Sequence, residues 1–213
     1  MEGHKGEPAR EAAIYDLEQR RLIDEEITRR TIDFMKRGVA SGTPFYAYVP
    51  YTQVHFPTLP NPRFAGKTGY GDFSDSLAEM DAHVGELLDA VDALGIGDNT
   101  IVVFTSDNGP EATWPWQGSS GPWRGYYFTH MEGSLRVPFI IRWPGHVPAG
   151  RVSNEIVHEV DTFTTLAVIA GAAIPQDRAI DGVDQSDFML GKSEKSNREG
   201  FPVFVRDRLE AVK

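Results

Sequence analysis

The sequence of 213 residues contains no cysteine, and this absence excludes several kinds of site. Without thiols the chain has no disulfide framework, no thiolate zinc site and no cysteine nucleophile. Long apolar runs are also missing: no stretch approaches the roughly 20 residues of a membrane-spanning helix, so no membrane partner is expected. Residues 1–8 are polar and lack the apolar core of a signal peptide, and the sequence assigns no compartment.

Positive charge is scarce as well. The chain has 21 Lys and Arg against 31 Asp and Glu, a formal net charge of -10. A nucleic-acid partner is not expected, because phosphate binding requires an excess of basic residues. A small anionic substrate is compatible with this charge, since one focused basic pocket can lie in an acidic protein. The length and the 40% hydrophobic content are ordinary for one α/β domain or the larger part of one.

Hydrophobic periodicity predicts the elements of that domain. Residues 12–37 carry an uneven apolar stripe among charges, which predicts a surface helix, and residues 74–94 place apolar side chains on one face at helical spacing. A further helix is predicted at residues 161–170. Short apolar runs predict buried strands at residues 45–49, 100–105 and 137–143, and a last strand at 201–205. A helix, a turn and a buried strand make half of a βαβ unit, so a mostly parallel sheet flanked by helices is expected.

The sharpest chemical feature is the pair Asp107 and Asn108, directly after the strand predicted at 100–105. Ligands of open parallel sheets bind beyond the carboxyl ends of the strands. A carboxylate and an amide there offer two oxygen ligands, which suit a hard divalent cation, Ca²⁺ or Mg²⁺. The alternative is an Asp-Asn-Gly turn that hydrogen-bonds its own backbone. Two ligands do not complete a site, so further ligands are expected from elsewhere.

His55 is the second candidate, in a proline-rich loop at residues 50–71 that is long enough to suggest function. If the strand before this loop runs parallel to the strand before Asp107, the two side chains reach the same edge of the sheet. A histidine there can hydrogen-bond an anionic ester or protonate a leaving oxygen. The alternative is a partly buried loop histidine with no chemical role.

A third feature follows in two glycine-containing segments, residues 122–125 and 131–138. Arg124 can clamp an anion through its planar guanidinium. Arg136 is expected to form an ion pair that anchors the start of the strand predicted at 137–143. The glycines let backbones approach closely.

Together these segments resemble the type I sulfatases. The histidine loop, the metal motif and the segments that follow it in that family are matched in order and spacing, over roughly residues 40 to 205. The matching segments are Tyr48–Pro57, Phe104–Glu111, Trp123–Gly125, Glu132–Pro138, Arg142–Gly150, Asp161–Gly171 and Asp181–Asp184. A lone Asp-Asn-Gly is a weak signal, but this ordered set favours the functional interpretation of Asp107, Asn108 and His55.

The resemblance implies an alkaline-phosphatase-like α/β fold, with residues 1–39 as a helical N-terminal segment of the same domain and residues 40–213 as the rest of it, truncated at both ends. It also implies the chemistry: a formylglycine hydrate attacks sulfur, while a Ca²⁺ ion, or Mg²⁺, binds the sulfate oxygens and the nucleophile. Asp107 and Asn108 would be metal ligands, and His55 would contact the sulfate and the leaving-group oxygen.

Three departures from the family pattern stand out. The opening strand with its paired aspartate ligands and the nucleophile motif Cys/Ser-Xaa-Pro-Xaa-Arg are both expected upstream, and both are missing here. Ser120–Arg124 fits the bare nucleophile pattern, but by its order it matches a different segment. The family often carries a lysine five residues before Glu132, where this chain has Tyr127, a hydrogen-bond donor without positive charge. Either Arg124 or an unseen group supplies the positive charge that the lysine would bring, or the leaving group is stabilised differently from the rest of the family.

The leading hypothesis is therefore a sulfatase fragment that acts on a small anionic sulfate ester. One alternative is a phosphoester or phosphonate hydrolase of the same superfamily, because phosphate and sulfate are both tetrahedral anions. The other is a non-catalytic remnant that serves as a binding module. Loss of the opening strand would bare sheet edges, so self-association through those edges is expected, alongside weak Ca²⁺ binding and poor turnover.

Overall fold

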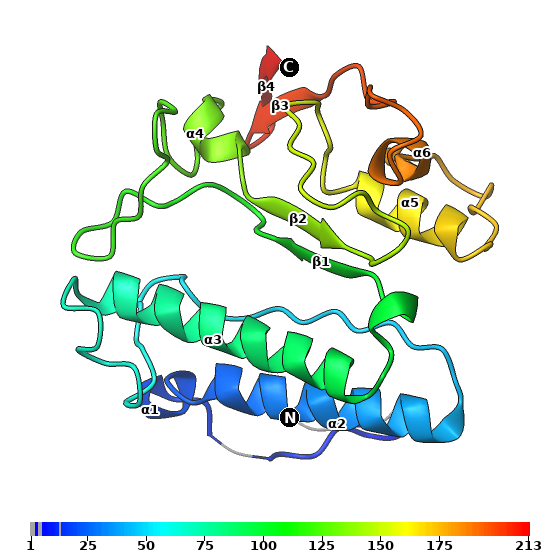
Figure 1. Cartoon of the computed structure of the whole chain (residues 1–213). Helices are drawn as coiled ribbons and strands as arrows, with labels where there is room; N and C mark the ends of the chain where they lie inside the picture. The colour runs from blue at the N-terminus through cyan, green and yellow to red at the C-terminus, as the bar shows by residue number, and fades with distance from the viewer. Residues whose placement is uncertain (1–2, 4–5, 13) are drawn as a thin grey trace. The chain divides into compact units, whose positions relative to one another are not determined.

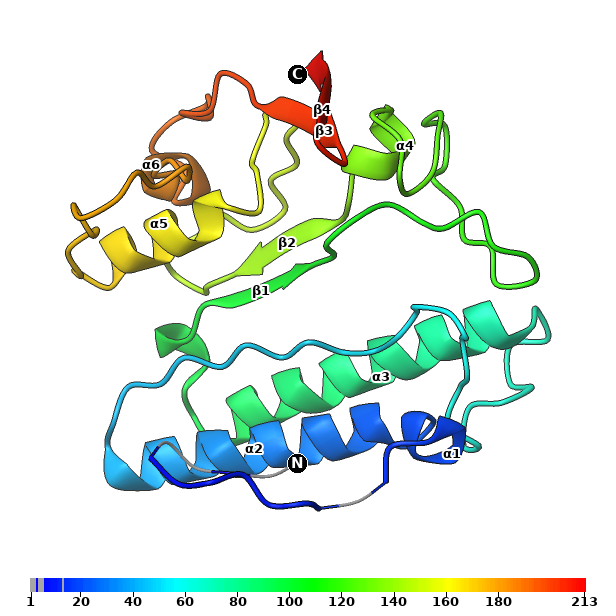
Figure 2. The same ribbon diagram turned by 180° about the vertical axis from the view of Figure 1, so that it is seen from behind.

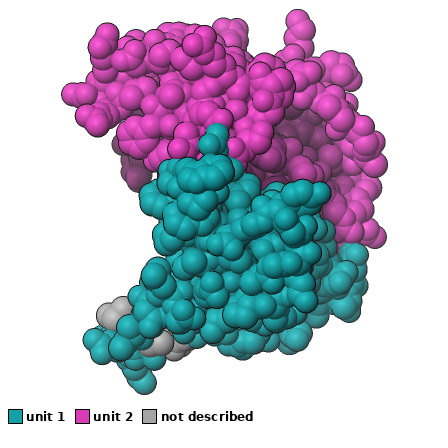
Figure 3. Space-filling model, turned by 90° about the vertical axis from the view of Figure 1, so that its left-hand side faces the viewer, with its two compact units in different colours: residues 1–95, 113–117 teal, residues 96–112, 118–213 magenta. Residues whose placement is uncertain are grey.

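The computed structural model describes residues 3, 6–12 and 14–213, which form two compact units (Figure 3). Unit 1 consists of residues up to 95 together with 113–117, and unit 2 of residues 96–112 and 118–213. Part of the polar N-terminus, and one position of the first predicted helix, lie outside the described residues. None of the helices in the described part of the chain has the length and apolar character needed to cross a bilayer.

Unit 1 is built on two helices that lie side by side in both ribbon views (Figures 1 and 2). Helix α2 spans Ile23–Ser41 and α3 spans Asp72–Ala93, and the single turn α1, Leu17–Arg20, precedes them. Met35 of α2 and Val91 of α3 are buried apolar side chains of this unit. The two long helices predicted from periodicity are therefore confirmed, although the first begins only at Leu17 and breaks after α1.

The strand predicted at residues 45–49 is wrong. This segment has no strand partner among the described residues, and Tyr46 and Tyr48 are 71% and 75% exposed. Phe45 instead packs edge-on against Phe34 of α2, with ring centroids 5.7 Å apart. An aromatic, β-branched run favours a strand only where a neighbouring strand satisfies its backbone N–H and C=O groups, and no described strand does so.

Unit 2 carries both sheets of the described chain, each a pair of antiparallel strands (Figure 1). Strand β1, Val102–Thr105, pairs with β2, Phe139–Arg142, so that the first residue of β1 lies opposite the last of β2. Strand β3, Pro202–Val205, pairs with β4, Arg208–Val212, with a bulge in the register. Three of the four predicted strands are thus confirmed as strands.

Strands β1 and β2 are antiparallel, so this pair does not contribute to the parallel part of the expected sheet. A parallel pair needs a crossover connection, usually a helix packed on the sheet. The connection here contains only the single-turn helix α4, Glu132–Leu135, and the chain returns beside β1 in the opposite direction. The 3-10 turn η1, Gly97–Asn99, leads into β1. The strands are also less buried than expected, since Ile140 is 61% exposed.

The rest of unit 2 is organised by two helices that lie side by side in both views (Figures 1 and 2). Helix α5, Asp161–Ile169, confirms the helix predicted at this position, and the single turn α6, Ser186–Met189, packs against it. Asp161 begins α5 and is fully buried, with 0% exposure. A charged group in such a place requires strong partners, because burial removes it from water.

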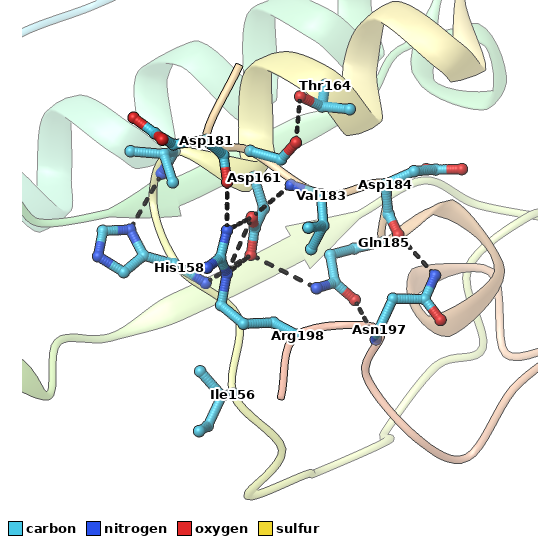
Figure 4. A network of polar contacts seen from close by, with 12 residues as sticks. Ile156, His158, Asp161, Thr164, Asp181, Val183, Asp184, Gln185, Asn197 and Arg198 are labelled. Atoms are coloured by element: carbon cyan, nitrogen blue, oxygen red, sulfur yellow. Dashed lines mark hydrogen bonds and ion pairs between the residues drawn. The ribbon is translucent and has the colours of Figure 1, made fainter. Parts of the chain in front are cut away.

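Arg198 is the main partner of Asp161 (Figure 4). Its Nη2 lies 2.6 Å from Oδ1 and its Nε 2.9 Å from Oδ2, and the backbone N–H groups of His158 and Val183 donate to the same carboxylate at 2.9 Å each. Burial alone would raise the pKa of Asp161, but Arg198 and these backbone donors hold the pKa below its ordinary value. Segments before, within and after α5 therefore meet at one carboxylate.

Candidate functional site

Asp107 and Asn108 follow the end of β1, with Ser106 between the strand and Asp107. The Asn108 amide nitrogen donates to the Gly109 carbonyl at 2.9 Å, and the Ser106 hydroxyl lies 3.4 Å from Asp107 Oδ1. These are contacts of a self-contained turn, the alternative interpretation of the motif. Asp107 is nevertheless exposed and Asn108 half-buried, and with its nitrogen engaged Asn108 has its oxygen Oδ1 to offer a cation.

Three glycines, Gly109, Gly125 and Gly133, bring this turn against the two segments that follow it, and we call them the glycine seam. Gly109 N donates to the Ser134 carbonyl and Gly133 N to the Arg124 carbonyl, both at 2.8 Å. A β-carbon on Gly109 would collide with the carbonyl oxygen of Gly133, and one on Gly133 with that of Gly125. The close backbone approach predicted for the glycines of the two later segments is therefore confirmed.

Tyr127 belongs to the same loop cluster. Its backbone N–H donates to the Pro110 carbonyl at 2.9 Å, and its ring packs edge-on against Phe128 with centroids 4.8 Å apart. Phe128 has a φ of 69°, a left-handed conformation that is uncommon for a bulky residue. Tyr127 is 40% exposed, so its side chain is accessible to a ligand.

The two arginines of this cluster have different roles. Arg136 Nε lies 2.5 Å from Glu132 Oε2, and the Arg136 guanidinium stacks 4.1 Å from the centroid of the Trp123 ring. The ion pair predicted for Arg136 at the start of β2 is therefore confirmed. Arg124 contributes its backbone carbonyl to the glycine seam and is exposed, which leaves its guanidinium accessible to an anion.

His55 lies in unit 1, on a loop that the helices of that unit hold in place. Arg20 of α1 donates through Nη2 to the His55 carbonyl at 2.9 Å and through Nε to the Pro57 carbonyl at 3.2 Å. The ring nitrogen Nδ1 of His55 lies 2.5 Å from the Phe56 carbonyl, which only accepts, so Nδ1 carries a proton. Nε2 is then the nitrogen that can act on a substrate, and His55 is exposed rather than partly buried.

Two buried carboxylates that sequence patterns did not single out hold the same loop. Asp24 of α2 accepts the backbone N–H of Thr52, at 2.9 Å to Oδ1, and that of Gln53, at 3.0 Å to Oδ2. Glu79 Oε2 of α3 accepts the backbone N–H of Asn61 at 2.8 Å. Burial raises the pKa of Asp24, although these N–H donors oppose the rise. In the sequence both acids look like ordinary members of charged helices, and only the loop donors facing them distinguish them.

The structure gathers Asp107, Asn108, Arg124 and Tyr127 in one loop cluster of unit 2, whereas His55 belongs to unit 1. Within the described residues, no group of three or more His, Cys, Asp or Glu could hold a metal ion. Asp107 and Asn108 supply the oxygen donors that Ca²⁺ prefers, but Ca²⁺ takes about six to eight of them. The two residues therefore fit part of a coordination shell.

Comparison with known proteins identifies the family. The family model described as Sulfatase matches residues 6–172. Steryl-sulfatase of Rattus norvegicus is 39% identical over 196 residues, which cover 89% of this chain and 34% of that protein. N-acetylgalactosamine-6-sulfatase of Canis lupus familiaris is 41% identical over 165 residues, which cover 76% of this chain and 32% of that protein. The chain belongs to the sulfatase family.

A solved structure extends the comparison to the fold. The PsFucS1 sulfatase from Pseudoalteromonas sp. matches 99% of this chain with a TM-score of 0.93 and 32% sequence identity, and the match covers 43% of that chain. This likeness indicates the alkaline-phosphatase-like α/β fold, and the two small sheets described here belong to its β part. The chain spans about a third of the length of the curated relatives it matches.

Proposed function

We propose that this chain carries part of a sulfatase active site and acts in the hydrolysis of a sulfate ester. The glycine seam is the observation that carries the proposal, because it joins the turn with Asp107 and Asn108 to the loop with Arg124 and Tyr127. A turn that offers two side-chain oxygens, in a loop cluster that also carries a guanidinium and a phenol, is suited to a cation and to the anion that the cation neutralises.

Each predicted residue then has a role set by its chemistry. Arg124 would clamp two oxygens of the sulfate group with its planar fork, and Tyr127 would donate a hydrogen bond to another. His55 would act through Nε2, because the Phe56 carbonyl engages Nδ1. When the ester S–O bond breaks, a protonated Nε2 would give its proton to the leaving oxygen, which becomes a hydroxyl. Overall one water is consumed, and an alcohol and sulfate are formed.

The metal and the nucleophile of the family fit this chain to different degrees. A bound divalent cation, Ca²⁺ or Mg²⁺, would stabilise charge on the sulfate oxygens, and Asp107 and Asn108 would hold it in part. The formylglycine motif is matched only by the bare pattern of Ser120–Arg124. The Ser120 hydroxyl donates to the Trp123 carbonyl at 2.7 Å and so closes a turn. No nucleophilic step is therefore assigned to this chain.

The charge of the loop cluster favours a sulfate ester over a phosphate ester. A sulfate monoester carries one negative charge, whereas a phosphate monoester carries about 1.5 to 2 at neutral pH. Arg124 offers an exposed positive charge, Arg136 and Lys213 share the single carboxylate of Glu132, and Tyr127 adds a donor without charge where the family often carries a lysine. In a chain with a net charge of -10, the monoanion is the better match.

We further propose that the chain self-associates through open sheet edges. Strands β1 and β2 form a sheet of two strands, so each has an edge without a strand partner among the described residues. Ile140 of β2 adds exposed apolar surface, as do Tyr46 and Tyr48 in unit 1. Open edges and exposed aromatic side chains are recognised routes to pairing between chains.

Isothermal titration calorimetry of the 213-residue chain with CaCl₂ and inorganic sulfate tests the sulfatase proposal. We expect weak Ca²⁺ binding that strengthens when sulfate is present and is lost in Asp107→Ala and Asn108→Ala. Asp98→Ala is the matched control, because Asp98 is an exposed acid in η1 near the other end of β1, and it should bind as the wild type does.

Two outcomes would overturn the proposal. A folded chain that gives no heat change at saturating Ca²⁺ and sulfate would favour the non-catalytic binding module. If the chain binds inorganic phosphate more tightly than sulfate, and this binding is lost in Asp107→Ala and Asn108→Ala, the phosphoester hydrolase is favoured instead.

A further inference from the structure

A buried glutamate and a buried histidine face each other one turn apart on α3. Glu79 and His83 are both 0% exposed, and Nε2 of His83 lies 3.7 Å from Oε1 of Glu79. This distance allows an ion pair but exceeds a hydrogen bond, and neither atom has a hydrogen-bond partner among the described residues. Two buried polar atoms without partners lower the stability of the fold. A proton on Nε2 reduces this loss, because it places a cation opposite the Glu79 carboxylate.

The other oxygen of Glu79 holds the loop that carries His55. Oε2 accepts the backbone N–H of Asn61 at 2.8 Å and the side-chain amide of Gln53 at 3.3 Å. Gln53 precedes His55 and Asn61 follows it, so one carboxylate fastens the loop on both sides of the histidine. Hydrogen bonds to a charged acceptor are stronger than neutral ones, so a carboxylate is a firm anchor for these two contacts.

We propose that Glu79 is a positioning residue for His55, and that the protonation state of His83 sets how firmly Glu79 holds the loop. With His83 protonated, a cation faces the buried Glu79 carboxylate, and both loop contacts persist. With His83 neutral, the buried carboxylate has no cation facing it, and the loop opens so that water can solvate it. We call the contacts of Glu79 with His83, Gln53 and Asn61 the brace. The inference rests on the proposed function, since the brace matters for catalysis only if His55 acts on the ester.

The groups around His83 set the pH at which its ring loses the proton. Glu79 raises the pKa of His83 above its ordinary 6.5, with burial opposing and Glu86, 3.4 Å from Nδ1, adding to the rise. The Tyr51 ring stacks on the imidazole with centroids 6.1 Å apart, and burial raises the pKa of Tyr51 to about 12, so it stays neutral. Asp24 of α2 adds negative charge near Glu79 and Tyr51.

The sign of the pH dependence follows from the direction of this shift. A group whose pKa is raised on folding contributes its full stabilisation below the unfolded pKa and loses it as the pH rises through the folded value. The brace is therefore complete below about pH 6.5 and is lost as the pH rises through the higher folded pKa of His83.

Amide hydrogen exchange and histidine titration by NMR, on the 213-residue chain without metal or substrate, test the brace. The Asn61 amide reports the Glu79 contact. Its protection factor, corrected for the intrinsic pH dependence of exchange, should fall by about tenfold or more across the titration of the His83 ring. The Val91 amide of α3 is the internal control and should keep its protection. Asn61 protection that does not follow the His83 titration would overturn the proposal.

Variants separate the brace from simple packing. In His83→Gln and in Glu79→Gln, Asn61 protection should lose its pH dependence, whereas Asp89→Asn, at an exposed position of α3, should behave as the wild type. A pH-dependent loss that survives in folded His83→Gln would refute the idea. If both variants unfold, the wild-type titration still decides. Because neither Ca²⁺ nor sulfate is present, failure here leaves the proposed function standing, and the reverse also holds.

Discussion

The carbonyl oxygen of Gly133 occupies the space that a β-carbon on Gly109 would need. The contact holds the turn that bears Asp107 against α4, where Gly109 N donates to Ser134. We expect Gly109→Ala to lower the free energy of unfolding by about 1–3 kcal/mol, because backbone rather than a flexible side chain must give way. It should also abolish Ca²⁺ binding. Urea denaturation followed by circular dichroism measures the first effect and calorimetry the second.

Gly85 provides the control for this substitution. It lies inside α3 with open space around its α-carbon. Gly85→Ala should therefore raise the free energy of unfolding, by about 0.5–1 kcal/mol, through helix propensity alone. Equal destabilisation by the two alanines would contradict the steric account of the glycine seam.

Removing Arg198 should be severely destabilising. Arg198→Ala leaves the buried charge of Asp161 without its counter-ion, and breaking a buried pair in this way costs about 3–5 kcal/mol. The control is Arg178→Ala, whose pair with Asp177 is exposed and should contribute less than about 1 kcal/mol. Similar unfolding midpoints for the two variants in urea would show that the network around α5 is not a stabilising centre.

The same pair predicts a pH dependence. Despite burial, Arg198 and the backbone donors hold the pKa of Asp161 below its ordinary 3.8. The stabilisation is therefore present above that pH and is lost as the pH falls through the lower folded pKa. The stability gap between wild type and Arg198→Ala should be widest near neutral pH and should narrow below pH 3.8. A gap that widens in acid would contradict the ion-pair explanation.

Tyr127 stands where the family often carries a lysine, and its replacement tests the charge of the site. Tyr127→Lys should tighten sulfate binding by about tenfold, roughly 1.4 kcal/mol, because it adds a cation to the loop cluster. Val152→Lys, at an exposed position of unit 2, makes the same change in net charge and should have little effect. Calorimetric titration with sulfate distinguishes a local effect from a general one, and equal gains in both variants would rule out a local role.

Self-association can be tested at the aromatic segment of unit 1. Sedimentation velocity should show association of the wild-type chain that rises with concentration. The double substitution Tyr46→Ser and Tyr48→Ser should weaken it, because it removes two exposed rings that lie close together in one segment, whereas Tyr70 is a single exposed ring elsewhere in unit 1. Tyr70→Ser, also at an exposed position, is the matched control. A wild-type chain that sediments as a monomer at all concentrations would contradict this part of the proposal.

Sequence patterns predicted the elements whose stability is mostly local. The apolar face of α3 repeats at helical spacing over several turns, and the helix is found at Asp72–Ala93. The segment at residues 45–49 has equally strong strand composition but forms no strand, because strand formation depends on a partner. The antiparallel direction of β2 relative to β1 is not visible in the sequence for a related reason, since it depends on how the loop between them turns.

In the candidate site, too, sequence patterns indicate some of the important residues and not others. The order of its segments predicts that Asp107 and Arg124 belong to one site, and in the structure the glycine seam links the turn after Asp107 to the segment that contains the Arg124 carbonyl. Asp24 and Glu79 could not be found in this way, because acidic residues are common on exposed helix faces. Their importance lies in the loop N–H groups they accept, and these come from residues more than 15 positions away along the chain.

Arg20 and Asp24 give the N-terminal helices a structural role that their charged composition does not indicate. Both lie before residue 40, yet both bind the loop around His55. A chain trimmed to residues 40–213 would keep all five predicted site residues while losing two of the groups that fasten the histidine loop. Anyone engineering a smaller version of this protein should retain the helices from Leu17 onward, since they act as the histidine's scaffold.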